Sequence, residues 1–221
     1  TNAHPHLSQD GTVAVVHNGT IENFSELRSM LQREGYEFRS QTDSETLAHL
    51  IEMFMRQGST LVDAVQKMHA IVSGAYGIAV VTSREPRTLV AARNGSPLVL
   101  GIADHGYLIG SDAISLRDHT DEVVYFNDGE MVVVRDDGYT TLTLTNEEIH
   151  KDVETLTWTL DEIAKGGFDH FMLKEIFEQP DAVRRTLAGR VVAGSTKIHL
   201  GGSPAIEDFV RDRMTNILIT D

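Results

Sequence analysis

Apolar residues in the first third of this chain recur every three or four positions, the spacing of helices that bury one face. A short apolar run at 13–16 precedes them and predicts a buried strand that ends at Asn18-Gly19. Asn23, with Glu26 three residues later, has the pattern of a capping box that opens the first helix. The pattern predicts helices at 23–35, 43–58 and 60–71 and a short strand at 36–40.

From residue 76 onward the spacing changes to short apolar runs. Turn-forming groups rich in Asn, Asp, Gly and Pro separate these runs, as they do in hairpins. Such a series predicts a long antiparallel β region. Because helices and strands occupy separate blocks, the expected class is α+β, with stacked sheets and helices outside. The predicted strands are 78–82, 88–92, 98–102, 107–110, 123–126, 131–134 and 140–144.

The composition changes again after about residue 146, where polar residues and the single tryptophan lead into a glycine pair. A helix is expected at 170–178, and Pro180 is typical of the first position of a second helix that ends near Gly189. Residues 190–205 are rich in glycine and are predicted to be irregular. A short helix at 205–214 and a strand at 217–219 are expected to follow.

Acidic residues outnumber basic ones by 33 to 19, so the formal net charge is −14. A surface of this sign repels nucleic-acid phosphates and anionic membranes, and neither is expected as a partner. No apolar run approaches the ~18 residues of a membrane span, and the first residues lack a signal-peptide pattern, so a cytoplasmic location is expected. The absence of cysteine excludes disulfides and thiolate metal sites.

Asn18-Gly19 has two interpretations. The pair is the strongest signal of a two-residue hairpin turn, although a helix rather than a strand is expected next. Alternatively, the glycine N–H, which no Cβ atom obstructs, and the asparagine amide are two donors that can converge on one oxygen. Two converging donors are what the oxyanion of a tetrahedral intermediate requires.

Asp43 precedes the second predicted helix and also has two interpretations. Aspartate is a good N-cap residue, so its carboxylate can serve the helix. The same carboxylate can instead bind the ammonium group of a substrate. Both roles are compatible if Ser44 caps the helix while Asp43 points into a pocket.

His4, His6 and His17 are close enough in sequence to raise the question of a metal site. Pro5 sets an extended geometry that need not bring His4 and His6 together, and no acidic residue has the spacing of a further ligand. We therefore expect a structural hydrogen bond from His4 or His17, and no bound metal.

Six short motifs follow one another in the order Asn-Ala-His-Pro-His (2–6), Val-Val-His-Asn-Gly-Thr-Ile-Glu-Asn (15–23), Thr-Asp-Ser-Glu (42–45), Gly-Ala-Tyr-Gly (74–77), Gly-Ser-Pro-Leu (95–98) and Lys-Glu-Ile-Phe-Glu-Gln-Pro (174–180). Together they resemble the glutaminase half of the glutamine–fructose-6-phosphate aminotransferase family, and the similarity covers nearly the whole chain. The second and third motifs alone are typical of any class II glutamine amidotransferase. The last motif narrows the resemblance to the sugar-phosphate enzymes.

The resemblance implies an N-terminal-nucleophile hydrolase fold, a four-layer αββα sandwich with two antiparallel sheets, here truncated at its N-terminus. In that family an N-terminal Cys thiolate attacks the side-chain amide of glutamine, forming a γ-glutamyl thioester and releasing ammonia. This chain holds neither that Cys nor the Arg-Trp-Ala-Thr-His segment that binds the glutamine carboxylate, and both are expected to precede Thr1. No cofactor is implied.

Carried over by motif, Asn18 and Gly19 would hold the oxyanion, Asp43 would bind the α-ammonium group of glutamine, and His4 would support the pocket. The ammonia would then aminate fructose 6-phosphate in a sugar isomerase domain that is expected to follow this chain. The product implied by the resemblance is glucosamine 6-phosphate. A homo-oligomer is expected.

Residues 1–155 are expected to form the glutaminase core, and 156–221 its end, a linker and the start of the isomerase domain. The isolated chain is expected not to hydrolyse glutamine, because it holds no thiol. Two alternatives stay open. One is a class II amidotransferase domain with a different acceptor, and the other is a non-catalytic domain that binds glutamine or regulates a partner.

Overall fold

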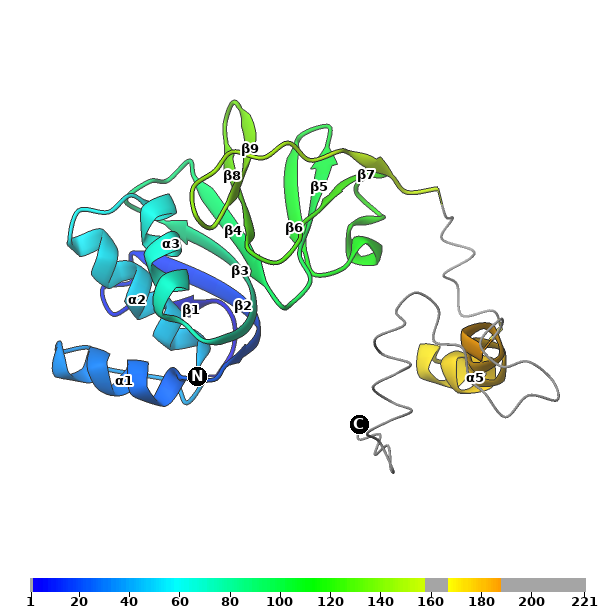
Figure 1. The fold of residues 1–221 in the computed structure, drawn as a ribbon, viewed down its shortest axis with the longest axis horizontal. Coiled ribbons are helices and arrows are strands. Elements are labelled where there is room, and N and C mark those ends of the chain that lie inside the picture. The colour runs from blue at the N-terminus through cyan, green and yellow to red at the C-terminus, as the bar shows by residue number, and fades with distance from the viewer. Residues whose placement is uncertain (1, 158–166, 188–221) are drawn as a thin grey trace, which may run out of the picture. The chain divides into compact units, whose positions relative to one another are not determined.

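Three helices lie between the first two long strands, at the positions that their apolar spacing predicts. They are α1 (Phe24–Arg33), α2 (Ser44–Arg56) and α3 (Leu61–Ile71). A computed structural model describes residues 2–157 and 167–187 (Figure 1), and the chain divides into two units between Thr157 and Trp158. The second unit contributes helix α5 (Phe171–Leu187) to the described residues.

The larger sheet of the first unit has the strand order β1-β2-β3-β4-β8-β9, and its neighbouring strands are antiparallel. β2 and β3 pair along the full length of both strands, whereas β1 pairs with only two residues near the start of β2. The rest of the outer edge of β2 therefore lies beyond the reach of β1. The strands are β1 (His6–Leu7), β2 (Val13–Ile21), β3 (Gly74–Thr82), β4 (Leu89–Asn94), β8 (Glu130–Arg135) and β9 (Gly138–Thr143).

The smaller sheet has the order β10-β7-β5-β6 and is also antiparallel. The short apolar runs of the sequence correspond to strands in both sheets, so the predicted β region is confirmed. The two-residue strands β1 and β10 have no counterpart among the predicted runs. The strands are β5 (Val99–Ala103), β6 (Gly106–Gly110), β7 (Glu122–Tyr125) and β10 (Glu154–Thr155).

Alternation along the strands gives the larger sheet two buried faces. In β4, Val90 and Ala92 pack with residues of the three helices, whereas Ala91 between them packs against the smaller sheet. Leu100 and Phe126 fill the space between the sheets from the other side. The two antiparallel sheets are thus stacked face to face, and α1, α2 and α3 cover the outer face of the larger one (Figure 1). This is the predicted α+β arrangement.

The outer face of the smaller sheet carries a short 3-10 helix, η1 (Ala113–Leu116). The side chain of Leu116 approaches Gly101 and Gly110, whose lack of a Cβ atom leaves room for it. None of the described helices is long and apolar enough to cross a membrane.

Asn18-Gly19 lies inside β2 and not at the tip of a loop, so the strand is longer than predicted and no hairpin turn occurs there. Asn18 pairs with Gly77, and Gly19 pairs with Tyr76. Gly19 has a φ of +134°, and a Cβ atom on it would overlap the carbonyl oxygen of Ala75. The close approach of β3 explains why glycine occupies this position.

Two predictions near α1 are wrong because tertiary contacts override the local pattern. Asn23 makes no capping hydrogen bond to α1. Its amide instead donates to the Ile71 carbonyl, and its oxygen accepts from the Ser73 N–H, which ties the start of α1 to the end of α3. Residues 36–40 form a loop and not a strand. The N–H groups of Glu37, Arg39 and Ser40 bond to side chains instead of to a neighbouring strand.

Helix α5 continues through Pro180, where the sequence predicts a new helix. A proline inside a helix removes one hydrogen bond and bends the helix, but it need not end it when the flanking residues favour helix. The segments predicted at 190–205, 205–214 and 217–219 lie outside the described residues.

Replacing Gly19 by alanine is expected to lower the free energy of unfolding by about 3 kcal/mol or more, because the new Cβ atom overlaps the Ala75 carbonyl and φ is strained for an L residue. Gly11→Ala is the matched control. Its φ is +73° but nothing lies within 4 Å of the added Cβ, so a loss of about 1 kcal/mol is expected. Urea unfolding measures both variants, and equal losses would show that crowding by β3 is not the reason for the glycine.

Candidate active site

Side chains take the place of a strand along the outer edge of β2. Beyond the two residues that β1 covers, the His17 N–H donates to Nε2 of His4 at 3.3 Å. Further along, the Ile21 N–H donates to Oδ2 of Asp43 at 2.8 Å. Shielded main-chain donors need such acceptors, and here two side chains from outside the sheet supply them.

The N–H of Gly19 lies on the same edge between these two bonds. In an antiparallel ladder, alternate residues direct their N–H groups to the same side, and His17, Gly19 and Ile21 are alternate residues of β2. Among the described residues, no side-chain acceptor takes a hydrogen bond from Gly19. We call the segment 17–21 with its two side-chain acceptors the β2 edge. It presents one open main-chain donor between two occupied ones.

The side chain of Asn18 lies on the face of β2 that is turned toward the smaller sheet. It is exposed and lines a cavity of about 160 Å³, together with His4. The wall of this cavity also includes residues of β3, of the segment before β5 and 109–111 at the end of β6. Gly19 and Asp43 are not among the lining residues; they lie along the adjoining β2 edge.

Asp43 lies directly before α2, but its side chain makes no capping hydrogen bond to that helix. It crosses instead to β2, where Oδ2 accepts from Ile21 and Oδ1 lies 4.0 Å from Nδ1 of His17. The Asp43 side chain is 22% exposed, and an ionised carboxylate offers about four lone-pair sites. Asp43 can therefore accept hydrogen bonds from a cationic group while it holds the Ile21 N–H.

Ser44 does not cap α2 either; its hydroxyl bonds to the ring of His17. The Oγ atom lies 2.9 Å from Nδ1, and both side chains are buried. Burial lowers the pKa of His17, and the nearby Asp43 charge only partly opposes this, so the fold favours the neutral ring. The expectation that His4 or His17 makes a structural hydrogen bond is confirmed.

The histidines near the N-terminus make contacts with each other and with the fold. The rings of His4 and His6 meet edge to face with centroids 5.2 Å apart, and Nε2 of His6 lies 3.3 Å from the Thr42 hydroxyl. Within the described part of the chain, no group of three or more His, Asp, Glu or Cys side chains could hold a metal ion.

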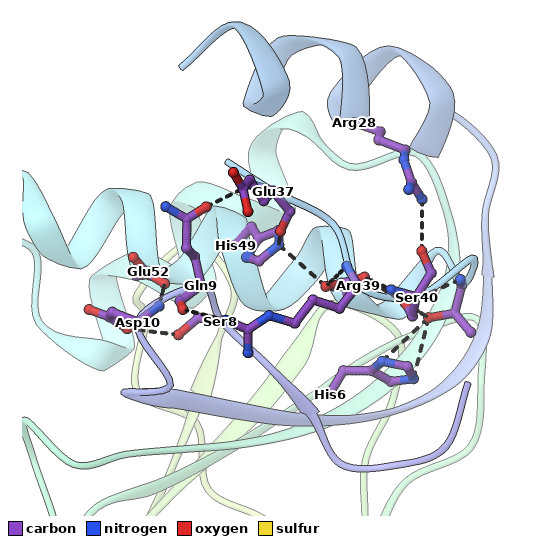
Figure 2. A network of polar contacts seen from close by, with 12 residues as sticks. His6, Ser8, Gln9, Asp10, Arg28, Glu37, Arg39, Ser40, His49 and Glu52 are labelled. Carbon is purple, nitrogen blue, oxygen red and sulfur yellow. Dashed lines mark hydrogen bonds and ion pairs between the residues drawn. The ribbon is translucent and has the colours of Figure 1, made fainter. Parts of the chain in front are cut away.

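A buried carboxylate with no predicted role organises the loop before Asp43. Figure 2 shows Arg39 and Ser40 of this loop within a network of polar contacts. Glu45 accepts from the main-chain N–H groups of Arg39 and Ser40 at 2.8 and 2.7 Å, and from the Ser40 hydroxyl at 2.6 Å. Burial alone would raise the pKa of Glu45, but these hydrogen bonds outweigh it and hold the pKa below its ordinary value. The signal for this residue was its place at the end of Thr-Asp-Ser-Glu, in the first turn of α2.

These groups can bind a ligand that carries an oxygen at one end and a cation at the other. The open N–H of Gly19 and the amide of Asn18 are donors for the oxygen, and Asp43 is the acceptor for the cation. The Asp43 carboxylate sits at Ile21, two residues from Gly19 or about 6.6 Å along the strand. The site therefore suits a short amino acid whose side chain ends in a carbonyl.

The buried histidines predict a loss of stability in mild acid. Burial lowers the pKa values of His17 and His49, so the unfolded chain, with histidine pKa values near ~6.5, takes up protons first as the pH falls. The free energy of unfolding should thus be constant between about pH 7.5 and 9 and fall below about pH 6.5. Urea unfolding at several pH values measures it.

His49→Gln is the control. It removes one buried histidine and should reduce the slope of the free energy of unfolding against pH. The lowered pKa of Glu45 acts only below about pH 4.5 and does not contribute in this window. Equal stability at about pH 7.5 and 5.5 would contradict the assignment of neutral, buried rings.

This chain is similar in sequence to known proteins of one family. A model of the glutamine amidotransferase domain matches residues 1–118, which is more than half of the chain. The glutamine–fructose-6-phosphate aminotransferase (isomerizing) of Chlorobaculum tepidum is 50% identical over 215 residues, which cover 96% of this chain and 34% of that protein. The protein of the same name from Methanothermobacter thermautotrophicus is 47% identical over 189 residues, covering 84% and 31%. The chain thus spans about a third of the length of these curated relatives.

Solved structures agree on the fold. Glutamine phosphoribosylpyrophosphate amidotransferase from B. subtilis is similar at a TM-score of 0.54 and 28% identity, covering 65% of this chain and 32% of that one. A structure described as the allosteric regulatory enzyme of purine biosynthesis has a TM-score of 0.52 and 27% identity, with 63% and 30% covered. The stacked antiparallel sheets are those of the N-terminal-nucleophile hydrolase fold, as expected. The chain therefore belongs to the glutamine amidotransferase family.

Proposed function

We propose that this chain binds glutamine and releases its amide nitrogen as ammonia for a glutamine–fructose-6-phosphate aminotransferase. The observation that carries the proposal is the β2 edge, where the open N–H of Gly19 lies next to Asn18 and between the side chains that hold His17 and Ile21. The family match and the names of relatives that are 50% and 47% identical support the same activity.

The proposed roles follow from the direction of each group. The Asn18 amide and the Gly19 N–H stabilise the oxyanion that forms when the glutamine amide is attacked. Asp43 accepts from the α-ammonium group of glutamine. His4 supports the pocket by accepting from the His17 N–H, which keeps the neighbouring stretch of the β2 edge in place.

The nucleophile in this proposal is a Cys thiolate outside this sequence, because the chain contains no cysteine. Attack on glutamine forms a γ-glutamyl thioester and releases ammonia, and water then hydrolyses the thioester. The chain alone, without a thiol, should give no hydrolysis.

We assign residues 1–155 to the glutaminase core and 156–221 to its end and the connection to a sugar isomerase domain. In the whole protein that domain uses the ammonia to convert fructose 6-phosphate to glucosamine 6-phosphate, for amino-sugar biosynthesis. A homo-oligomer in the cytoplasm, with neither a cofactor nor a bound metal, completes the proposal.

A second candidate is an amidotransferase with a different acceptor. The structural likeness to a glutamine phosphoribosylpyrophosphate amidotransferase supports the glutamine site but leaves the acceptor open. A chimeric enzyme separates the two candidates. In it, this chain replaces the matching third of the C. tepidum relative, and glutaminase activity and glucosamine 6-phosphate are measured separately. Hydrolysis without transfer would favour the different acceptor, and loss of both would contradict the proposal.

In the chimeric enzyme, Asn18→Ala is expected to lower kcat for glutamine hydrolysis on the order of 10²–10³-fold with little change in KM, because the oxyanion exists only in the transition state. Gln32→Ala, at an exposed position of α1 outside the β2 edge, is the control and should leave both constants nearly unchanged. A rise in KM without a fall in kcat would assign Asn18 to ground-state binding instead.

Asp43→Asn should act in the opposite way, raising KM for glutamine by about tenfold or more while kcat stays within a few-fold, because it removes a charge that binds substrate and transition state equally. Steady-state kinetics with glutamine measures this. An unchanged KM would overturn the ammonium role.

A further inference from the structure

The loop between α1 and α2 leads directly into Asp43. Residues 36–42 form no regular structure. The Tyr36 N–H donates to the Leu31 carbonyl, and side chains accept from the N–H groups of Glu37, Arg39 and Ser40. The Glu45 carboxylate binds two of these N–H groups and one hydroxyl: Oε1 accepts from Arg39 N, and Oε2 accepts from Ser40 N and Ser40 Oγ. Glu45 is 3% exposed, so these bonds are shielded from water.

The same loop is held from two other elements, as Figure 2 shows around Ser40 and His6. Arg28 of α1 donates to the Ser40 carbonyl at 3.2 Å, and the Ser40 hydroxyl lies 3.0 Å from Oγ1 of Thr42. Thr42 in turn contacts His6 of β1. The segment directly before Asp43 is therefore held by the buried Glu45 carboxylate together with Arg28 and His6.

We propose that Glu45 is the positioning residue for Asp43. It folds residues 39–42 back onto the first turn of α2, and this sets the point at which the Asp43 carboxylate meets the Ile21 N–H. The consequence for glutamine rests on the proposed function. The effect on the hydrogen bond from the Ile21 N–H does not rest on the proposed function, because both groups that form this bond are in this chain.

The first test is amide hydrogen exchange on this chain, read by NMR. In Glu45→Gln, an amide replaces one of the two acceptor oxygens, so the loop loses main-chain partners and Asp43 is no longer fixed. Exchange at the Ile21 N–H is expected to accelerate about tenfold or more, whereas exchange in the core of β4 stays as it was.

Glu52→Gln is the matched control. Glu52 is also a buried carboxylate on α2, two turns further along, where it accepts from Asp10 N and pairs with Arg56. Its loss should cost stability without accelerating exchange at Ile21 beyond the global change. Equal acceleration in both variants, or none in Glu45→Gln, would overturn the positioning role.

The second test uses the chimeric enzyme and a double-mutant cycle. Glu45→Gln should raise KM for glutamine with kcat nearly unchanged, and adding it to Asp43→Asn should raise KM no further, because both changes remove one function. Additive effects would mean that Glu45 acts independently of Asp43. If Asp43→Asn itself leaves KM unchanged, the proposed function fails while the exchange test still decides the positioning role.

If Glu45→Gln does not fold, Ser40→Ala replaces it in the amide exchange test. It deletes the hydroxyl bond to Glu45 together with the two bonds of the same hydroxyl to Thr42, and it leaves both main-chain bonds to Glu45 in place. A smaller acceleration at Ile21, on the order of two- to fivefold, is expected, and no acceleration would count against the proposal.

Discussion

The structure depends on how the outer edge of β2 satisfies its main-chain donors. β1 is too short to cover this edge, and an uncovered row of N–H groups is a liability for a sheet. Two side chains replace the missing strand, His4 from the N-terminal segment and Asp43 from the start of α2. Between them lies Gly19, whose N–H binds the amide oxygen of glutamine in the proposed function. The need to satisfy the N–H groups of β2 thus accounts both for the stability of this edge and for the position of its open donor.

In the proposed function Asp43 binds the ligand while it also holds the Ile21 N–H, and the residues that follow it fix its position. Ser44 bonds to the buried ring of His17, and Glu45 holds the loop that precedes Asp43. Three consecutive residues of one motif therefore have three separate partners. This explains why Asp43 makes no capping hydrogen bond to α2, although it occupies the usual position for one.

The sequence predicted the parts of the fold that local periodicity controls. The helices α1, α2 and α3 and the short strands of both sheets follow from apolar spacing and turn residues. The failures concern long-range pairing. Gly19 lies within a strand because β3, more than fifty residues away, pairs with it, and Asn23 bonds to Ser73 instead of to its own helix. The candidate site was identified by motif, whereas the role of Glu45 required the folded loop.

The most direct measurement is the amide exchange rate of Gly19 compared with those of His17 and Ile21 in this chain. Gly19 is expected to exchange about a hundredfold faster than His17 and Ile21, because their N–H groups are hydrogen-bonded and its own is not. A Gly19 amide protected as strongly as Ile21 in the absence of ligand would contradict the open donor on which the proposed site is built.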